Sequence, residues 1–450
     1  MHQATRPEPP ATYRWIVLFF VSLTMFGNYY VYDCIAPVAD LLTKQLGFSD
    51  SNIGLLQAIY SIPNIFMVVI GGYIVDRIGT SKAIFIFGSL CMVGAVVTVL
   101  SPMLWVMVVG RLLFGLGAES LIVAVTTAVA KWFRGKELSF AFGLNLMLAR
   151  AGSLLAQQSP SWAGYAYTNW RSPLLLSVAF ATFCVTGAAA YWLLEGWGEK
   201  KYQIGPAAST DKVVFSDIKA FGTSYWLIVA LCIVFYSAIF PFETFAYKFF
   251  MDVHHTTREA GGDLVGMLTI FTMFGTPLFG LFVDKIGKRA LLMIFGSLLL
   301  IPVYLMMAYM QGTRFVTVYL PSTANGHLSL IAHQLPVLLL VTMGMMGIAF
   351  SLIPAVMWPS VAYIVDQSKL GTAYGVMTMI QNIGLAGFNL AVGWANDHSG
   401  ASAANPAGYR LGMWIFSVLG FLGVFLSALL RRREQGPHRH GLETITTASS

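Results

Sequence analysis

Long apolar stretches of about 20 residues recur along the whole chain, and short polar turns separate them. A stretch of this length and composition suits an α-helix that crosses the hydrocarbon core of a bilayer. We therefore expect a membrane-spanning helix at each of twelve windows. They cover residues 14–38, 52–75, 83–101, 104–131, 138–163, 172–194, 224–250, 263–283, 290–310, 331–357, 372–395 and 408–430.

A charged turn occurs twice. Residues 72–79 read Gly-Tyr-Ile-Val-Asp-Arg-Ile-Gly, and residues 280–287, 208 positions later, read Gly-Leu-Phe-Val-Asp-Lys-Ile-Gly. Each copy follows one apolar stretch and precedes another. The repetition indicates a duplicated membrane domain, as many transporters have.

Composition supports a membrane protein. Hydrophobic residues make up 57% of the chain, charged residues only 10%, and the mean hydropathy is +0.70. A soluble protein of this size could not bury so much apolar surface. The expected fold is an all-α integral membrane protein with two pseudo-symmetric six-helix bundles. We expect these bundles at residues 1–196 and 223–432, with a charged cytoplasmic linker at 197–222 and a disordered tail at 433–450.

The formal charge of +7 does not indicate nucleic-acid binding, because the basic residues gather in alternate loops. By the positive-inside rule, both termini and the linker are cytoplasmic. The chain carries no Asn-x-Ser/Thr glycosylation site and its short N-terminal tail has no dileucine signal, which favours a bacterial inner (plasma) membrane.

No catalytic motif is present in the sequence: there is no HExxH, no G-x-S-x-G and no Walker loop. The four cysteines are scattered in apolar stretches without paired spacing. We expect neither an enzyme nor a metal site or cofactor.

The repeated turn resembles the loop signature of the major facilitator superfamily. A second signature of that superfamily, Arg-x-x-x-Gly-x-Gly, matches Arg111-Leu-Leu-Phe-Gly115-Leu-Gly117. The resemblance implies two six-helix bundles around a central cavity that opens alternately to each side of the membrane.

Several longer patterns resemble the lysosomal dipeptide transporters within that superfamily. They include residues 117–121 (Gly-Ala-Glu-Ser-Leu), 132–138, 149–153, Phe240-Pro-Phe, Trp358-Pro, 370–375 and 381–386. This resemblance implies a carrier of short peptides, chiefly dipeptides, that works as a uniporter. In that family an acidic residue and an arginine engage the charged ends of the peptide, and the matching positions are Glu119 and Arg150.

The residues themselves support a pairing of Glu119 and Arg150. Glu119 lies 12 positions before Lys131, and Arg150 lies 12 positions after Leu138. In a helical hairpin both side chains therefore lie about 18 Å from the cytoplasmic ends, near the middle of the bilayer. A carboxylate and a guanidinium at one depth could clamp a zwitterion, or they could form a structural salt bridge.

Polar residues at helical spacing mark further candidates for the substrate site. Such stripes line a wet cavity or hold helices together through hydrogen bonds, and the sequence allows both. The substrate-binding candidates of this kind are Tyr29, Tyr32, Tyr60, Asn64, Trp358, Gln381 and Asn382.

Other ionisable residues suggest coupling and gating. Glu243, Asp33 and Arg111 are candidates for coupling; Glu243 could bind a cation or a proton or pair with Lys248, and Arg111 could pair with Glu119, bind loop carbonyls or stabilise the fold. In the repeated turn we expect Asp76, Arg77, Asp284 and Lys285 to close a gate through hydrogen bonds at helix ends.

The sequence thus predicts a carrier of short peptides that works by rocker-switch alternating access. One alternative is a proton-coupled symporter of a small organic acid, with Arg150 on the carboxylate and Glu119 or Glu243 carrying the proton. Another is a ligand sensor on a transporter fold that carries no flux. The expected partners are a small-molecule substrate and the lipid bilayer, without nucleic acid, and the expected state is a monomer.

Overall fold

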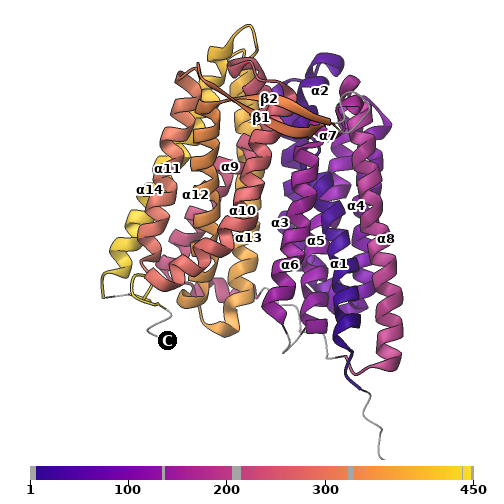
Figure 1. Cartoon of the computed structure of the whole chain (residues 1–450). Helices are drawn as coiled ribbons and strands as arrows, with labels where there is room; N and C mark the ends of the chain where they lie inside the picture. Colours follow the sequence, from indigo (N-terminus) through magenta and orange to yellow (C-terminus); the bar gives the residue numbers. More distant parts are fainter. Residues whose placement is uncertain (1–6, 134–136, 205–213, 323–328, 438, 447–450) are drawn as a thin grey trace, which may run out of the picture. The chain divides into compact units, whose positions relative to one another are not determined.

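The structure is a computed structural model that describes residues 7–133, 137–204, 214–322, 329–437 and 439–446. Within these ranges, 12 helices are long and apolar enough to cross a membrane (Figure 1). They coincide with the twelve windows predicted from hydropathy, and the all-α membrane fold is confirmed.

The first part of the chain contains six of these spans, together with short helical pieces between them. In chain order it consists of α1 (Ala11–Asp33), η1 (Ala36–Val38), α2 (Ala39–Leu46), α3 (Asp50–Ile78), α4 (Thr80–Leu100), α5 (Leu104–Phe133), α6 (Leu138–Gln157), α7 (Ser159–Trp162), η2 (Gly164–Thr168) and α8 (Arg171–Lys201).

The second part contains the other six spans and a β-hairpin. Its elements are η3 (Phe215–Ala220), α9 (Thr223–His254), α10 (Arg258–Ile286), α11 (Arg289–Tyr309), β1 (Phe315–Ser322), β2 (Ser329–Pro336), α12 (Val337–Ile364), η4 (Gln367–Lys369), α13 (Leu370–His398), η5 (Pro406–Tyr409) and α14 (Arg410–Glu434).

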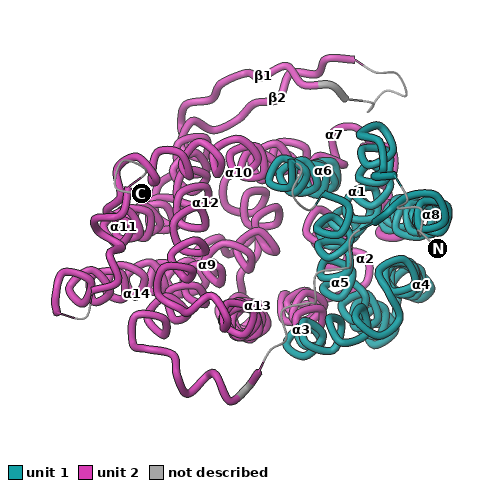
Figure 2. The backbone as a smooth tube through the Cα atoms, turned by 90° about the horizontal axis from the view of Figure 1, so that it is seen from below, with its two compact units in different colours: residues 1–34, 62–156, 174–212 teal, residues 35–61, 157–173, 213–450 magenta. Residues whose placement is uncertain are grey.

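The chain forms two compact units, which Figure 2 colours separately. Unit 1 comprises residues 1–34, 62–156 and 174–212. Its helices pack closely where glycine allows the backbones to approach. A Cβ on Gly152 of α6 would lie 2.2 Å from the Phe26 carbonyl oxygen of α1, and a Cβ on Gly117 of α5 would lie 2.6 Å from the Phe87 carbonyl oxygen of α4. Any larger residue at these positions would force α6 or α5 away from its neighbour.

Unit 2 comprises residues 35–61, 157–173 and 213–450. It therefore combines the later helices with two segments of the earlier part. Aromatic side chains from three helices fill its core: the rings of Phe242, Tyr304 and Phe416 lie 5.1–5.9 Å apart, centre to centre. At these spacings each ring pair contributes attraction beyond simple burial.

The β-hairpin was not predicted. The sequence predicts an irregular loop from Gln311 to about Gly326 and a spanning helix from residue 331, whereas strand β2 continues to Pro336 and α12 begins at Val337. The apolar residues of β2 run directly into those of α12, so hydropathy alone merges the two. Figure 1 shows the hairpin lying across the ends of α10 and α12; we call this end of the helices the hairpin end.

Both copies of the repeated turn end in a glycine with positive φ. Gly79 (φ +85°) follows α3 and Gly287 (φ +68°) follows α10. Only glycine adopts such angles without strain, which explains why both copies of the motif end in this residue.

A glutamate caps the helix that follows each copy of the turn. In unit 1, Glu195 of α8 accepts hydrogen bonds from the Thr80 hydroxyl (2.7 Å) and the Ser81 amide (3.1 Å) at the start of α4. In unit 2, Glu443 accepts hydrogen bonds from the amides of Ala290 (2.9 Å) and Leu291 (3.3 Å) at the start of α11. Both carboxylates satisfy amides that have no partner within their own helix.

Glu443 belongs to the segment that the sequence predicts to be disordered. In the described residues 439–446 the chain turns back onto α11: Leu442 is fully buried, and its carbonyl accepts a hydrogen bond from the Arg289 amide (3.0 Å). The His440 amide also donates to the Glu434 carboxylate (2.7 Å). Disorder is expected from the polar composition, but one buried leucine and two carboxylate contacts hold this segment in place.

Candidate functional site

Charged and polar side chains of unit 1 meet in the middle of helices α1, α5 and α6. Tyr29 and Asp33 are one helical turn apart on α1 and share one face. Arg150 comes from α6 and Glu119 from α5, and all four side chains are partly exposed. Such a group would be costly against lipid, so we take it as the candidate functional site.

Tyr29 is at the centre of this group. The Arg150 guanidinium carbon lies 5.7 Å from the centre of the Tyr29 ring, a cation–π contact. The Tyr29 side chain also interacts electrostatically with Glu119 and Asp33. Arg150 and Glu119 thus both act on the same tyrosine side chain.

Arg150 has a second acidic neighbour in Asp33. Asp33 is the last residue of α1, and it interacts electrostatically with both Arg150 and Arg111. Two carboxylates and two guanidinium groups therefore balance formally within this part of unit 1. Such a balanced cluster can exchange an internal partner for the charged end of a ligand at small net electrostatic cost.

Arg111 has a structural position. Its side chain is only 1% exposed, and it donates hydrogen bonds to the carbonyl oxygens of Val31 (2.9 Å) and Tyr32 (3.3 Å). These are carbonyls of the last turn of α1, which has no cation of its own there. Of the interactions that the sequence allowed for Arg111, the structure contains the one with backbone carbonyls, which stabilises the C-terminus of α1.

The Glu119 carboxylate stands out because, among the residues that the structure describes, it takes part in no hydrogen bond or ion pair. A half-buried carboxylate without a cation is unfavourable inside a membrane protein. Glu119 is therefore well suited to receive a cationic group from outside the chain.

Asn64 of α3 is another polar group without an internal partner. It is completely buried, and neither its amide nitrogen nor its amide oxygen has a hydrogen-bond partner in the described part of the chain. It directly follows Pro63, which removes one backbone hydrogen bond from α3. A buried amide of this kind requires water or a ligand to satisfy it.

Tyr32 is half-buried in unit 1, and the remaining candidates for substrate contact lie in unit 2. The Trp358 indole nitrogen donates to the Tyr236 hydroxyl (2.9 Å), and the Tyr374 hydroxyl donates to the Trp358 carbonyl (3.2 Å). The Gln381 side-chain oxygen accepts a bond from the Cys232 thiol (3.8 Å), and Tyr60 is buried. Asn382 donates to the Thr378 carbonyl one turn earlier (3.0 Å). Trp358 thus belongs to an ordered aromatic group on α9, α12 and α13.

Glu243 lies in the core of unit 2. Its side chain is 8% exposed and interacts electrostatically with Tyr304. The sequence suggested Lys248 as one possible partner, but Lys248 forms an ion pair with Asp50. The structure therefore does not support a Glu243–Lys248 pair.

The gating candidates lie at the ends of two helices: Asp76 and Arg77 near the end of α3, and Asp284 and Lys285 near the end of α10. Asp284 accepts a hydrogen bond from the buried Arg289 (2.7 Å), whose guanidinium also lies 4.8 Å from the centre of the Tyr363 ring. Asp76, Arg77 and Lys285 are exposed. Asp284 thus contacts the first residue of α11, and its role in closing a gate stays a prediction.

Two ion pairs at the hairpin end were missed by sequence reasoning. Lys248 of α9 pairs with Asp50, the first residue of α3, and both side chains are largely buried. Arg258 of α10 binds both carboxylate oxygens of Asp40 in α2, at 3.0 and 2.6 Å. Both pairs lie inside unit 2 and join the segment 35–61 to the later helices. The only sequence signal was opposite charge at the ends of distant helices.

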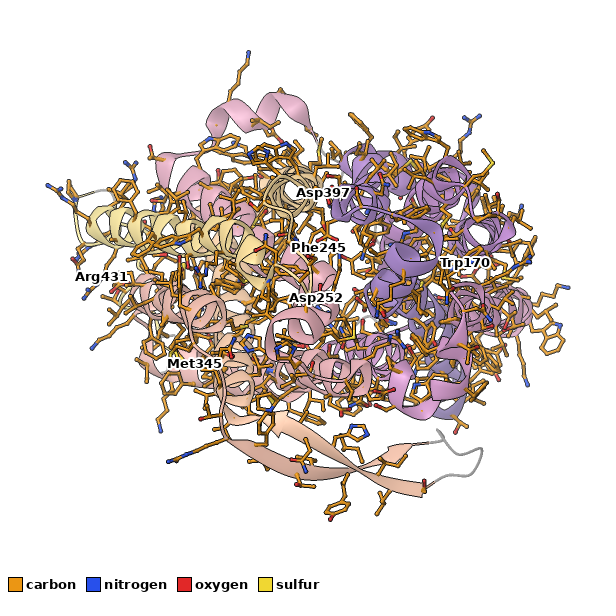
Figure 3. The ribbon with its side chains drawn as sticks, turned by 90° about the horizontal axis from the view of Figure 1, so that it is seen from above. Trp170, Phe245, Asp252, Met345, Asp397 and Arg431 are labelled. Atoms are coloured by element: carbon orange, nitrogen blue, oxygen red, sulfur yellow. The ribbon has the colours of Figure 1, made fainter. Side chains whose placement is uncertain are left out.

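A third carboxylate supports this contact. Asp397, labelled in Figure 3, accepts hydrogen bonds from the backbone amides of Asp50 and Ser51, each at 2.8 Å. The neighbouring Asn396 donates to the Asp50 carboxylate at 2.9 Å. The end of α13 thus caps the start of α3, although the two are far apart in the sequence.

We expect Asp397→Ala to destabilise this contact by about 1 kcal/mol, because loss of an N-terminal cap typically has that effect. The purified variant should melt at a lower temperature than wild type in the same detergent. Asp366→Ala, which changes an exposed acidic residue near the opposite helix ends, serves as the control. An unchanged melting temperature for Asp397→Ala would contradict the capping role.

The fold and this site define a membrane transporter of a known class. The family model of the Major Facilitator Superfamily matches residues 21–326. The chain therefore belongs to the major facilitator superfamily.

Curated relatives agree with this assignment. The lysosomal dipeptide transporter MFSD1 of Mus musculus is 30% identical over 401 residues, covering 86% of this chain and 81% of the relative. MFSD1 of Danio rerio is 29% identical over 394 residues, covering 85% and 80%.

Solved structures show the same fold. The bacterial homologue of the human lysosomal transporter Spinster, inward-facing and unoccupied, superimposes with a TM-score of 0.74 at 17% identity, covering 94% of this chain and 98% of that one. The peptide transporter POT superimposes with a TM-score of 0.71 at 13% identity, covering 96% and 97%.

Proposed function

We propose that the protein carries short peptides, chiefly dipeptides, across the membrane as a uniporter by rocker-switch alternating access. The observation that carries this proposal is the meeting of Arg150 and Glu119 around Tyr29. A zwitterionic peptide offers a carboxylate to Arg150 and an ammonium group to Glu119. The name of the MFSD1 relatives supports the same class of substrate.

The two ends of the peptide are recognised by different chemistry. The planar guanidinium of Arg150 can donate two parallel hydrogen bonds to a carboxylate, which fixes its orientation. Glu119 accepts the ammonium group, and the Tyr29 ring keeps Arg150 in place. The distance between the two charges then selects for length, since a free amino acid is too short to reach both side chains.

Further residues are proposed to contact the rest of the substrate. Tyr32 and Asn64 lie in unit 1, as Arg150 and Glu119 do. Tyr60, Trp358, Gln381 and Asn382 are proposed to contact peptide side chains or backbone during the cycle. Four charged residues of the repeated turn are proposed to close the cytoplasmic end: Asp76, Arg77, Asp284 and Lys285.

We further propose that the protein lies in a bacterial inner membrane as a monomer, with both termini in the cytoplasm and the hairpin end outside. In unit 2, basic residues such as Lys285, Lys288 and Arg431 lie at the helix ends opposite the hairpin, as the positive-inside rule requires of the cytoplasmic face. In the cycle, the Asp50–Lys248 and Asp40–Arg258 pairs must separate before the hairpin end can open.

A proton-coupled symporter of a small organic acid is the second candidate. It is favoured by the presence of two carboxylates, Asp33 and Glu119, around one arginine, Arg150. One carboxylate could then carry a proton while Arg150 holds the acid.

A thermal-shift panel distinguishes the two candidates. Free ligand at about 100 times its dissociation constant should stabilise the protein by about 2.7 kcal/mol. Dipeptides should raise the melting temperature of wild type, whereas free amino acids and amine-free carboxylic acids should not. Stabilisation by simple carboxylic acids, with no response to dipeptides, would replace the peptide carrier with the organic-acid symporter.

A further inference from the structure

The two faces of the β-hairpin differ. In the antiparallel register Val318 lies opposite His333, and these residues, with Leu335, belong to the face turned toward the helices, where His333 and Leu335 are buried. The other face is open, and Tyr319 and Leu330 are 66% and 68% exposed. The hairpin is therefore a ribbon with one face docked on the rest of unit 2.

One polar contact fixes strand β2 to α10. The His333 ring nitrogen Nδ1 is hydrogen-bonded to the Asp263 carboxylate, and both side chains are 5% exposed. Glu259, one turn before Asp263 on the same helix, also acts electrostatically on His333. Val318, opposite His333 on β1, is apolar, and α12 begins with the apolar run Val337-Leu-Leu-Leu-Val. Asp263 and Glu259 are therefore the charged groups that face His333 among the described residues.

The other strand reaches a different part of the molecule. Strand β1 packs against α7, the short helix that follows α6. That segment is itself bound to the later helices through Gln157, whose carbonyl accepts a bond from Tyr247 (2.6 Å) and whose side-chain oxygen accepts one from Thr269 (2.6 Å). The hairpin thus contacts α10 through β2 and α7 through β1, and α7 follows a residue that is hydrogen-bonded to α9 and α10.

We propose that the hairpin is a pH-sensitive strap: protonated His333, held by Asp263, keeps the ribbon docked across α10 and α7 and so favours closure of the hairpin end. The inference goes beyond the transport function proposed above, because it concerns the response of the gate to pH and does not depend on the substrate.

The direction of the pH effect follows from the environment of His333. The hydrogen bond that the His333 ring donates to Asp263, aided by the charges of Asp263 and Glu259, raises the pKa of His333 above its usual value, although burial opposes this. A detached hairpin would expose His333 to water and return its pKa to about 6.5. The stabilisation of the docked state is therefore fully present below the usual histidine pKa, and it is lost as the pH rises through the raised value. Acid keeps the strap docked, and alkaline pH favours its release.

Distances between two spin labels test the strap. We would place cysteines at Tyr319 on β1 and at Tyr165 in η2, both exposed, after replacing the four native cysteines, which are all buried, with alanine. Distances would be measured at about pH 5.5 and about pH 8.5, on either side of the histidine range. In the wild-type background we expect one short distance in acid and a growing population of longer distances at alkaline pH.

Two variants and a control identify the responsible pair. His333→Gln keeps a hydrogen-bonding group but cannot become charged, so its distance distribution should not change with pH. Asp263→Asn removes the counter-charge, and it should release part of the population even in acid. His398→Gln replaces an exposed histidine at the same end and should behave as the background does.

Each outcome decides the proposal. A pH-dependent shift that is lost in both His333→Gln and Asp263→Asn and retained in His398→Gln supports it. An identical distribution at both pH values in the background, or the same shift in His333→Gln, overturns it. Peptide binding is not needed for this result, so the strap and the proposed substrate can fail independently.

Discussion

Replacement of Arg150 by alanine should raise the dissociation constant of a dipeptide at least about 30-fold, because losing one partner of a buried charge pair costs about 2–5 kcal/mol. Arg150→Lys retains the positive charge but not the fork of donors, and it should lie between wild type and Arg150→Ala. Binding would be measured by calorimetry on purified protein. Arg171→Ala removes an exposed arginine from the start of α8 and should bind as wild type does.

Modified peptides show which end each residue recognises. A dipeptide with an amidated C-terminus should bind wild type weakly, and Arg150→Ala should weaken it little further. A dipeptide with an acetylated N-terminus should also bind wild type weakly, and Glu119→Gln should weaken its binding little further. This non-additivity is the signature of a direct interaction between the two altered groups. If amidation instead couples to Glu119, the peptide lies in the opposite direction.

A purely structural role of Glu119 and Arg150 gives a different pattern. Arg150→Ala and Glu119→Gln would then lower the melting temperature of the empty protein, and the affinity for dipeptides would change by similar factors for modified and unmodified peptides. That result would remove the observation that carries the peptide proposal.

Loss of one charge from the Asp50–Lys248 pair should open the hairpin end. Asp50→Asn leaves Lys248 buried without a counter-ion, and such a change typically costs about 3–5 kcal/mol. If that cost falls on the closed state alone, the ratio of open to closed molecules rises about 100-fold or more. Ala39→Cys, a buried position in α2 of the same segment, would report opening through its rate of reaction with a maleimide.

The double variant Asp50→Asn/Lys248→Met gives the decisive comparison. Both charges are then absent, so the closed state should recover and labelling at position 39 should slow again. Lys44→Met is a matched control, because Lys44 pairs with Asp40 but is 70% exposed and should contribute little. Labelling of Asp50→Asn at the wild-type rate would show that the pair does not hold this end closed.

The sequence predicts the membrane fold well because the relevant signals are local. Each span is a continuous apolar run, and each copy of the repeated turn ends in a glycine with positive φ, at Gly79 and Gly287. The similar depth of Glu119 and Arg150 is also local in this sense, since only four residues of sequence separate α5 from α6.

The unpredicted features depend on contacts between distant parts of the chain. Asp50 and Lys248 are 198 positions apart, and Asp40 and Arg258 are 218 apart. Nothing within either local segment identifies its partner. The prediction missed strand β2 for another reason. Leu330 and Ile331 add to the apolar run of α12, so the alternation of a short strand is hidden within a long hydrophobic stretch.

The cap at the start of α11 has a consequence for biosynthesis. Glu443 lies 153 positions after Ala290, and its carboxylate accepts a hydrogen bond from the Ala290 amide. The part of the chain that forms α11 is therefore translated long before its cap, and the helix start stays incomplete until Glu443 has been added. A nonsense codon after Arg433 would yield a chain with every spanning helix but an uncapped α11. We expect membrane quality-control proteases to remove such a chain faster than one with Glu443.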